Sequence, residues 1–268
     1  NYTVQFKSLR AGTVYTVNVG GGTGAAIPLK GGTQPFTTQE ANDEDMFTPL
    51  RLQSGYIRIV DDGKDANGNA FDWKDLIPAT DTARPVTLTH DSGGHATVDW
   101  VGFMQAQDFG SVLYGNPQER EFPVQCCLSV LAATQVSTTQ SQPNNLAFLL
   151  KYIFDSVPSH SFSTYYFQGG VDARTWLMKR FDWHNFLTDG QDEDLEPKYN
   201  LFEVLEDVCR FWGWTARTHR QNIYFTCADD AMEYRFLELT QYGLNLMANG
   251  TAAGDTVDTY ISDSISGD

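Results

Sequence analysis

Positive charge is scarce in this chain. Only 18 Lys and Arg residues stand against 34 Asp and Glu, which gives a formal net charge of −16 at pH 7. Nucleic acid and anionic membranes attract basic surfaces, so this balance argues against a general binder of either. Long apolar runs are missing too, because no stretch reaches the roughly 18 consecutive apolar residues of a membrane span. We therefore expect no nucleic-acid partner and no membrane span.

A secretory signal is also missing from the start of the sequence. Asn1–Phe6 alternates polar and apolar residues where a signal would carry an apolar core. The chain begins at Asn1 instead of Met, which fits a processed product or an excised piece of a longer protein.

Cysteine is sparse, with four residues in 268. That number is too low for a disulfide scaffold and favours reduced thiols in a protein made in a cytoplasm. Cys126 and Cys127 are adjacent and unsuited to bridging each other. Cys209 and Cys227 fall on elements that we expect to be neighbours, so a bridge between them stays open.

The first half of the chain has the pattern of a β-protein. Apolar residues form 41% of the sequence, enough for a core, and 23 glycines indicate many turns. Short runs rich in β-branched and aromatic residues recur between these turns. We predict a mainly β fold with an α+β part, in which an antiparallel β-barrel or sandwich module spans 1–125.

Helical signals begin after residue 126. Asn144 and Asn145 can cap a helix over 146–157, and Asn200 with Glu203 resembles a capping box for a helix over 201–212. The second helix repeats its apolar residues at helical spacing, and Gly213 suits its end. We predict a mixed helix-and-hairpin module over 126–228. The acidic, polar segment 229–268 is expected to be a tail or a linker to a missing region.

Two glycine-rich motifs are better explained by β-structure than as catalytic loops: Gly20–Gly24 as a hairpin loop, and the segment around Ser92 as a turn between two strands. Gly20–Gly24 follows a strand as a dinucleotide loop would, but Pro28 and Gly31 come too soon for a helix to open there. The sequence around Ser92 resembles a protease nucleophile turn, but no histidine precedes His90.

The sequence also contains no complete zinc or calcium motif. The five histidines are scattered, without zinc spacing: His90, His95, His160, His184 and His219. The segment Asp65–Asp72 offers oxygen ligands, but a calcium loop that began at Asp65 would need Gly at its sixth position, where Ala70 stands, and Glu at its twelfth, where Leu76 stands. A solvated turn is the favoured interpretation, and cation binding there stays open.

Acidic clusters raise the question of a glycosidase, which needs two carboxylates across a cleft. Glu119 and Glu121 form one cluster and Asp192–Glu196 another, but proximity in sequence does not place carboxylates across a cleft. Six tryptophans offer stacking surfaces for sugar, although most are better explained as core. They are Trp73, Trp100, Trp176, Trp183, Trp212 and Trp214. We assign no catalytic, cofactor-binding or metal residue, and expect no enzyme activity and no cofactor.

Several segments follow one another in a recognisable order. They are Pro35–Glu40, Phe47–Arg51, Ser54–Ile59, Trp100–Phe103, Tyr114, Pro117, Phe122–Cys126, Leu128–Leu131, Tyr199–Glu206 and Phe211–Trp214. Among them a strand of W-x-G-F type is followed by an extended strand ending F-P-V, and later by a helix, a G-W pair and a hairpin. Together they resemble the tail proteins of phages and prophages of Bacteroides-type gut bacteria.

This resemblance implies a fold similar to phage baseplate or tail-hub proteins. It also implies a structural role in the virion, assembly with other tail proteins in the bacterial cytoplasm, and a ring-shaped homo-oligomer, often a trimer. The chain is short for a complete hub, so it fits the N-terminal part of one. The alternative is a surface or secreted module that binds glycans or mediates adhesion, which the aromatics and the acidity permit.

Overall fold

The computed structural model describes most of the chain. The described residues are 1–8, 12–22, 24–40, 48–92, 94–106, 117–136, 145–158, 162–169, 171–180, 199–227, 236–240, 243–244 and 261–262. They divide into two compact units, of which one holds 1–42 and 52–127 and the other 43–51 and 128–268.

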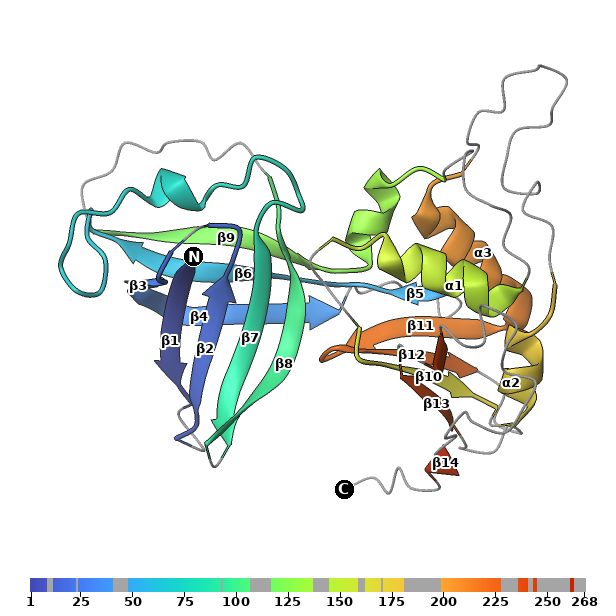
Figure 1. Cartoon of the computed structure of the whole chain (residues 1–268). Helices are drawn as coiled ribbons and strands as arrows, with labels where there is room; N and C mark the ends of the chain where they lie inside the picture. The colour runs from blue at the N-terminus through green and yellow to red at the C-terminus, as the bar shows by residue number, and fades with distance from the viewer. Residues whose placement is uncertain are drawn as a thin grey trace, which may run out of the picture. The chain divides into compact units, whose positions relative to one another are not determined.

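The first unit is built on an eight-stranded sheet with the order β3-β1-β2-β7-β8-β9-β6-β4 (Figure 1). Every neighbouring pair is antiparallel except β1 and β3. The strands are β1 (Tyr2–Lys7), β2 (Val14–Val19), β3 (Ile27–Leu29), β4 (Gly31–Glu40), β6 (Gln53–Asp61), β7 (Pro85–Ser92), β8 (His95–Met104) and β9 (Gln118–Cys126).

Alternation along these strands builds the core of the first unit. Successive side chains point to opposite faces, so every second residue of β1, β2 and β6 enters the interior. Val4, Val17 and Ile57 are almost fully buried in this way, beside Phe103 and Phe122 of the central strands. The long segment between β6 and β7 contributes the short 3₁₀ helix η1 (Trp73–Leu76), which buries Trp73 and Leu76.

The mainly β prediction is confirmed, but the sheet is not a closed barrel. Its two end strands, β3 and β4, are consecutive in the chain, with only Lys30 between them. β3 pairs with β1 over three residues only, and the register of β4 on β6 shifts between Gly31 and Phe36. Among the described strands, no ladder joins β3 to β4, so the sheet stays open between its two end strands.

The second unit combines a six-stranded mixed sheet with helices. Its strand order is β14-β13-β10-β12-β11-β5, in which β10 and β12 run parallel and so do β11 and β5. The strands are β5 (Leu50–Arg51), β10 (Thr164–Gln168), β11 (Trp214–His219), β12 (Asn222–Cys227), β13 (Phe236–Thr240) and β14 (Ile261–Ser262). The helices are η2 (Ser129–Ala133), α1 (Leu146–Asp155), α2 (Val171–Leu177) and α3 (Leu201–Trp212).

Helices α1 and α3 lie together on one side of this sheet (Figure 1). Both were predicted from their caps and apolar spacing, and both are present. Within the described part of the chain, no helix has the length and apolar character that a membrane crossing would require.

Two segments differ from the sequence prediction. We expected a polar tail from residue 229, but Phe236–Thr240 forms β13, which pairs with β10 and buries Phe236, Leu237 and Leu239. We also placed residues 48–51 in the first module, whereas they group with the second unit, where β5 pairs with β11. Both strands are short or show little alternation of polar and apolar residues. Their positions in the sheet depend on pairing with a strand that is distant in sequence.

Candidate interaction surface

Helix α3 is fixed at both ends by side-chain and backbone geometry. Asn200 Oδ1 accepts the backbone N–H of Glu203 at 2.9 Å, and Glu203 Oε2 accepts the N–H of Asn200 at 2.9 Å, which completes a capping box. Gly213 ends the helix in the left-handed region, with φ of 65°. One face of α3 is buried, so the residues of its last turn that lie off this face reach the surface. The buried residues are Leu201, Val204, Leu205, Val208 and Cys209.

An aromatic cluster gathers around that last turn. Trp212 stacks against Trp176 of α2, with ring centroids 5.7 Å apart, and against Trp214 of β11 at 5.9 Å. Trp214 is buried and continues the cluster to Phe167 and Phe225 in the core. Trp176 and Trp212 are half-buried, so the cluster runs from the core of the second unit to its surface.

Phe211 forms the outer edge of this cluster. Its side chain is 80% exposed, and its ring meets that of Trp212 at 86° with centroids 5.2 Å apart. We define Phe211, Trp212 and Trp176 as the aromatic surface. Aromatic side chains are enriched at protein interfaces and in sugar sites, so this surface is the candidate functional site of the described chain.

Charges on the same helix lie next to the aromatic surface. Arg210 Nη2 donates to Glu206 Oε1 at 2.8 Å, while Arg210 Nη1 lies 3.8 Å from Asp207 Oδ1. The contact between Arg210 and Asp207 is the longer and weaker of the two, so the Asp207 carboxylate can pair with another cation. From the sequence, Trp176 and Trp212 were interpreted as core residues, and neither Phe211 nor Asp207 was predicted to belong to a site.

A histidine–carboxylate pair on the first sheet was also missed. His90 Nδ1 lies 2.5 Å from Asp99 Oδ2, and the His90 ring lies 5.7 Å from that of Tyr15. Leu88 pairs with Trp100 and Thr89 with Val98, so Asp99 is an extra residue at a β-bulge. Bulges redirect side chains, which explains how Asp99 reaches His90 although the two lie on different strands.

The His90–Asp99 pair does not by itself make a protease site. Ser92 faces His95 in the β7–β8 ladder, and the nearby Gly94 N–H donates to the Asp91 carboxylate at 2.8 Å. These contacts describe a hairpin turn. An Asp–His pair alone orients an imidazole, and acyl transfer also needs a placed nucleophile and oxyanion donors.

The Gly20–Gly24 segment leads from β2 to β3, and a strand follows it in place of a helix. It is not the predicted hairpin loop, because β3 pairs in parallel with β1 and not with β2. Gly21 has φ of 87°, and a Cβ there would lie 2.1 Å from the carbonyl oxygen of Ala83. The glycines therefore allow close backbone packing against the segment before β7.

Glu119 and Glu121 are both engaged in the sheet. Glu119 Oε1 accepts the Thr33 N–H at 3.0 Å, where β4 leaves its ladder. Glu121 Oε1 pairs with Arg58 Nε at 2.6 Å, and its side chain is 51% exposed. These contacts give each carboxylate a structural partner on β4 or β6.

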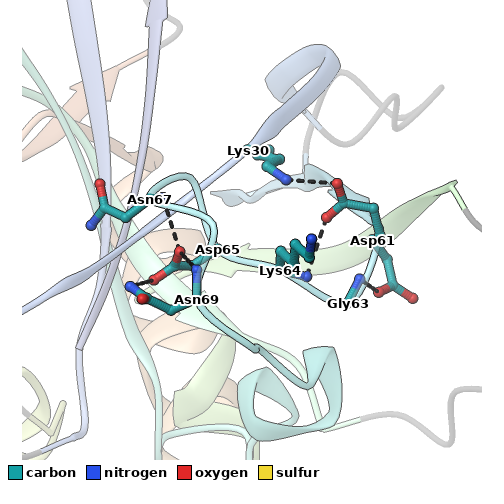
Figure 2. Close-up of polar contacts among 8 residues, drawn as sticks. Lys30, Asp61, Gly63, Lys64, Asp65, Asn67 and Asn69 are labelled. Carbon is teal, nitrogen blue, oxygen red and sulfur yellow. Dashed lines mark hydrogen bonds and ion pairs between the residues drawn. The ribbon is translucent and has the colours of Figure 1, made fainter.

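The Asp65–Asp72 segment forms a turn held by its own hydrogen bonds (Figure 2). Asp65 Oδ1 accepts the N–H groups of Asn67 at 2.9 Å and Asn69 at 2.8 Å, and Asp65 Oδ2 accepts the Asn69 amide at 3.0 Å. The Asn69 side-chain bond is the largest cause that lowers the pKa of Asp65 from its usual 3.8. Asp72 caps η1 by accepting from the Lys74 N–H. Both oxygens of Asp65 and one oxygen of Asp72 thus accept hydrogen bonds from donors within or next to the segment.

No metal site is evident in the part of the chain that the structure describes, because no three His, Cys, Asp or Glu side chains gather there. None of the four cysteines, all of which lie among the described residues, forms a disulfide, so Cys209 and Cys227 are not bridged. Burial, followed by the charge of Glu206, raises the pKa of the Cys209 thiol. His160, His184, Trp183 and the Asp192–Glu196 cluster lie outside the described residues.

Comparisons with known proteins add two solved structures. No family model and no curated protein matches the sequence. One similar structure is the 43 kDa tail protein of prophage MuSo2 from Shewanella oneidensis, with a TM-score of 0.39, 16% identity, and coverage of 81% of this chain and 56% of that chain. The other is a tail protein from Neisseria meningitidis MC58, with a TM-score of 0.41, 11% identity, and coverage of 81% and 52%. The chain thus spans about half the length of either protein.

Proposed function

We propose that the chain is a non-enzymatic structural component of a phage-derived tail or baseplate hub of a Bacteroides-group phage or prophage. It acts through protein–protein contacts in the virion and is assembled in the bacterial cytoplasm. Its partners are other tail or baseplate proteins and further copies of itself, in a trimeric ring.

The observation that carries this proposal is the unit formed by α3, Gly213, Trp214 and the β11–β12 hairpin. The resemblance to phage tail proteins implied a helix, a G-W pair and a hairpin in this order, and these elements follow one another from Leu201 to Cys227. The W-x-G-F and F-P-V segments fall on β8 and β9, two neighbouring strands of the first sheet.

The surface chemistry of the chain also supports assembly. Interfaces concentrate aromatic residues, and the aromatic surface on α2 and α3 places such residues in partial contact with solvent. A stable ring contact should bury more than about 1,000 Å² in total.

The location of the protein can be tested by immunogold electron microscopy with antibodies raised against the purified chain. We expect gold particles on tails or baseplates of particles from the source strain, and the chain in mass spectra of purified tails. Consistent absence from tails that are otherwise complete would refute the proposal.

The absence of catalysis can be tested by incubating purified protein with peptidoglycan, polysaccharides and peptides. We expect no turnover above a buffer control. Turnover that disappears in Glu119→Gln or Glu121→Gln, and persists in the remote substitution Glu203→Gln, would contradict the non-enzymatic proposal.

The second candidate is a glycan-binding or adhesion module at a cell surface. The aromatic surface favours it, because exposed indole and phenyl rings stack on sugar faces. A glycan array distinguishes the two: binding that depends on Trp212 would favour the adhesion module, whereas labelled tails without glycan binding would favour the tail component.

A further inference from the structure

Phe211 and Trp212 form an aromatic corner at the end of α3. Their rings meet at 86°, and Phe211 is 80% exposed. Trp176 and Trp214 stack against Trp212 and hold it in place. The corner therefore presents one exposed ring, Phe211, and one ring, Trp212, that is packed against two other tryptophans.

A carboxylate lies about one helical turn before Phe211. Asp207 is four residues before Phe211, and residues at this spacing are neighbours on a helix surface. The Asp207 side chain is 47% exposed, and Arg210 Nη1 is 3.8 Å away. Arg210 is closer to Glu206, at 2.8 Å, so Asp207 is the less neutralised of the two acids.

An aromatic corner with an adjacent carboxylate has the chemistry of a cation site. The ring faces are negative and attract a guanidinium or ammonium group, and tryptophan is the strongest ring for this contact. A carboxylate adds charge-assisted hydrogen bonds to the same group. The net charge of −16 also favours the approach of a basic partner to the chain.

We propose that Asp207, Phe211 and Trp212 bind an exposed arginine side chain of a partner protein. This inference rests on the proposed assembly function and gives the chemistry of one of its partners. The guanidinium stacks in the corner while Asp207 accepts its N–H groups. An acidic partner would use other residues, since Lys179 and Arg180 are exposed just after α2.

The proposal can be tested with a capped tetraarginine peptide and the intact chain, by isothermal titration calorimetry at low salt. We expect Asp207→Asn and Phe211→Ala each to weaken binding by about two- to fivefold, the usual effect of an exposed cation–π or ionic contact. Two matched controls should leave binding nearly unchanged. Asp155→Asn removes the same charge from an exposed ion pair on α1, and Val14→Ala shortens an exposed apolar residue on β2.

Two further ligands test the specificity of the site. Tetraglutamate and a chitin tetrasaccharide should bind no more tightly to the wild type than to Phe211→Ala. Equal losses in Asp207→Asn and Asp155→Asn would mean that only net charge attracts the peptide, and would overturn the inference. Preferential binding of tetraglutamate would instead assign the surface to an acidic partner, and preferential binding of the tetrasaccharide to a glycan.

The fates of the two proposals are separable. If immunogold labels the tails, but tetraarginine binds equally well to the Asp207→Asn and Phe211→Ala variants, the arginine site is rejected and the tail function stands. If the tails are not labelled, but tetraarginine binding depends on Asp207 and Phe211, the tail function is rejected. The site would then bind a basic protein that is not a tail component.

Discussion

Arg120 lies between a carboxylate and an aromatic ring in the first unit. Its Nε is 2.6 Å from Asp61 Oδ2, and its guanidinium carbon is 3.9 Å from the centre of the Trp73 ring. Asp61 is only 6% exposed, and its other oxygen accepts the Gly63 N–H at 3.3 Å. The arrangement ties the segment after β6 to strand β9.

Replacing Arg120 with Ala should therefore leave a buried carboxylate without its cation. We expect a loss of about 3–5 kcal/mol in the free energy of unfolding, the usual cost of removing one partner of a buried ion pair. Arg58→Ala is the matched control, because its partner Glu121 is half exposed, and it should cost less than about 1 kcal/mol. Urea unfolding followed by circular dichroism measures both, and equal costs would contradict this account of the pair.

The four thiols differ in their access to solvent. Cys126, Cys127 and Cys209 are fully buried and Cys227 is half-buried. Burial raises the pKa of Cys209, which removes the reactive thiolate at neutral pH. With Ellman's reagent we expect Cys227 to react first in the native protein. All four thiols should react in guanidinium without reductant, and two missing equivalents there would indicate that Cys209 and Cys227 are bridged.

Among the elements, α3 carries the strongest local signals and also supports the aromatic surface. Its capping box and terminal glycine set its length, and its apolar face sets its rotation toward the core. Trp212 and Phe211 are presented at the surface as a consequence of that rotation. The stability of this helix and the shape of the candidate site are thus linked.

Shortening Leu205 should weaken the second unit strongly. Leu205 is fully buried, so Leu205→Ala should cost about 2–5 kcal/mol through lost burial and the cavity left behind. Phe211→Ala, on the same helix but exposed, should change the unfolding midpoint little. A similar shift for the two variants would argue against the assignment of the buried face.

At the scale of the whole molecule, the described residues form two units with separate cores. The first core is enclosed by the eight-stranded sheet and η1, and the second lies between the six-stranded sheet and its helices. The chain passes between the units near residues 43, 51 and 127. Separate cores favour separate unfolding events.

We therefore expect two transitions in differential scanning calorimetry of the intact chain. Arg120→Ala should lower the midpoint of one transition, and Leu205→Ala that of the other. A single transition that both substitutions displace equally would mean that the units unfold together.

The sequence alone was sufficient where a signal lies within one or two turns of chain. The Asn200–Glu203 capping box, the apolar spacing from Leu201 to Val208, and Gly213 together predicted α3, because each contact joins residues close in sequence. The mainly β character of the first half was predicted for the same reason.

Tertiary structure decided the features that join distant segments. The aromatic surface needs Trp176 from α2 beside Trp212, and the His90–Asp99 pair needs a bulge in the β7–β8 ladder. The placement of β13 beside β10, and of β5 beside β11, depends on backbone hydrogen bonds to strands far away in the sequence. Such pairings leave little local pattern, because any exposed strand edge offers the same backbone donors and acceptors.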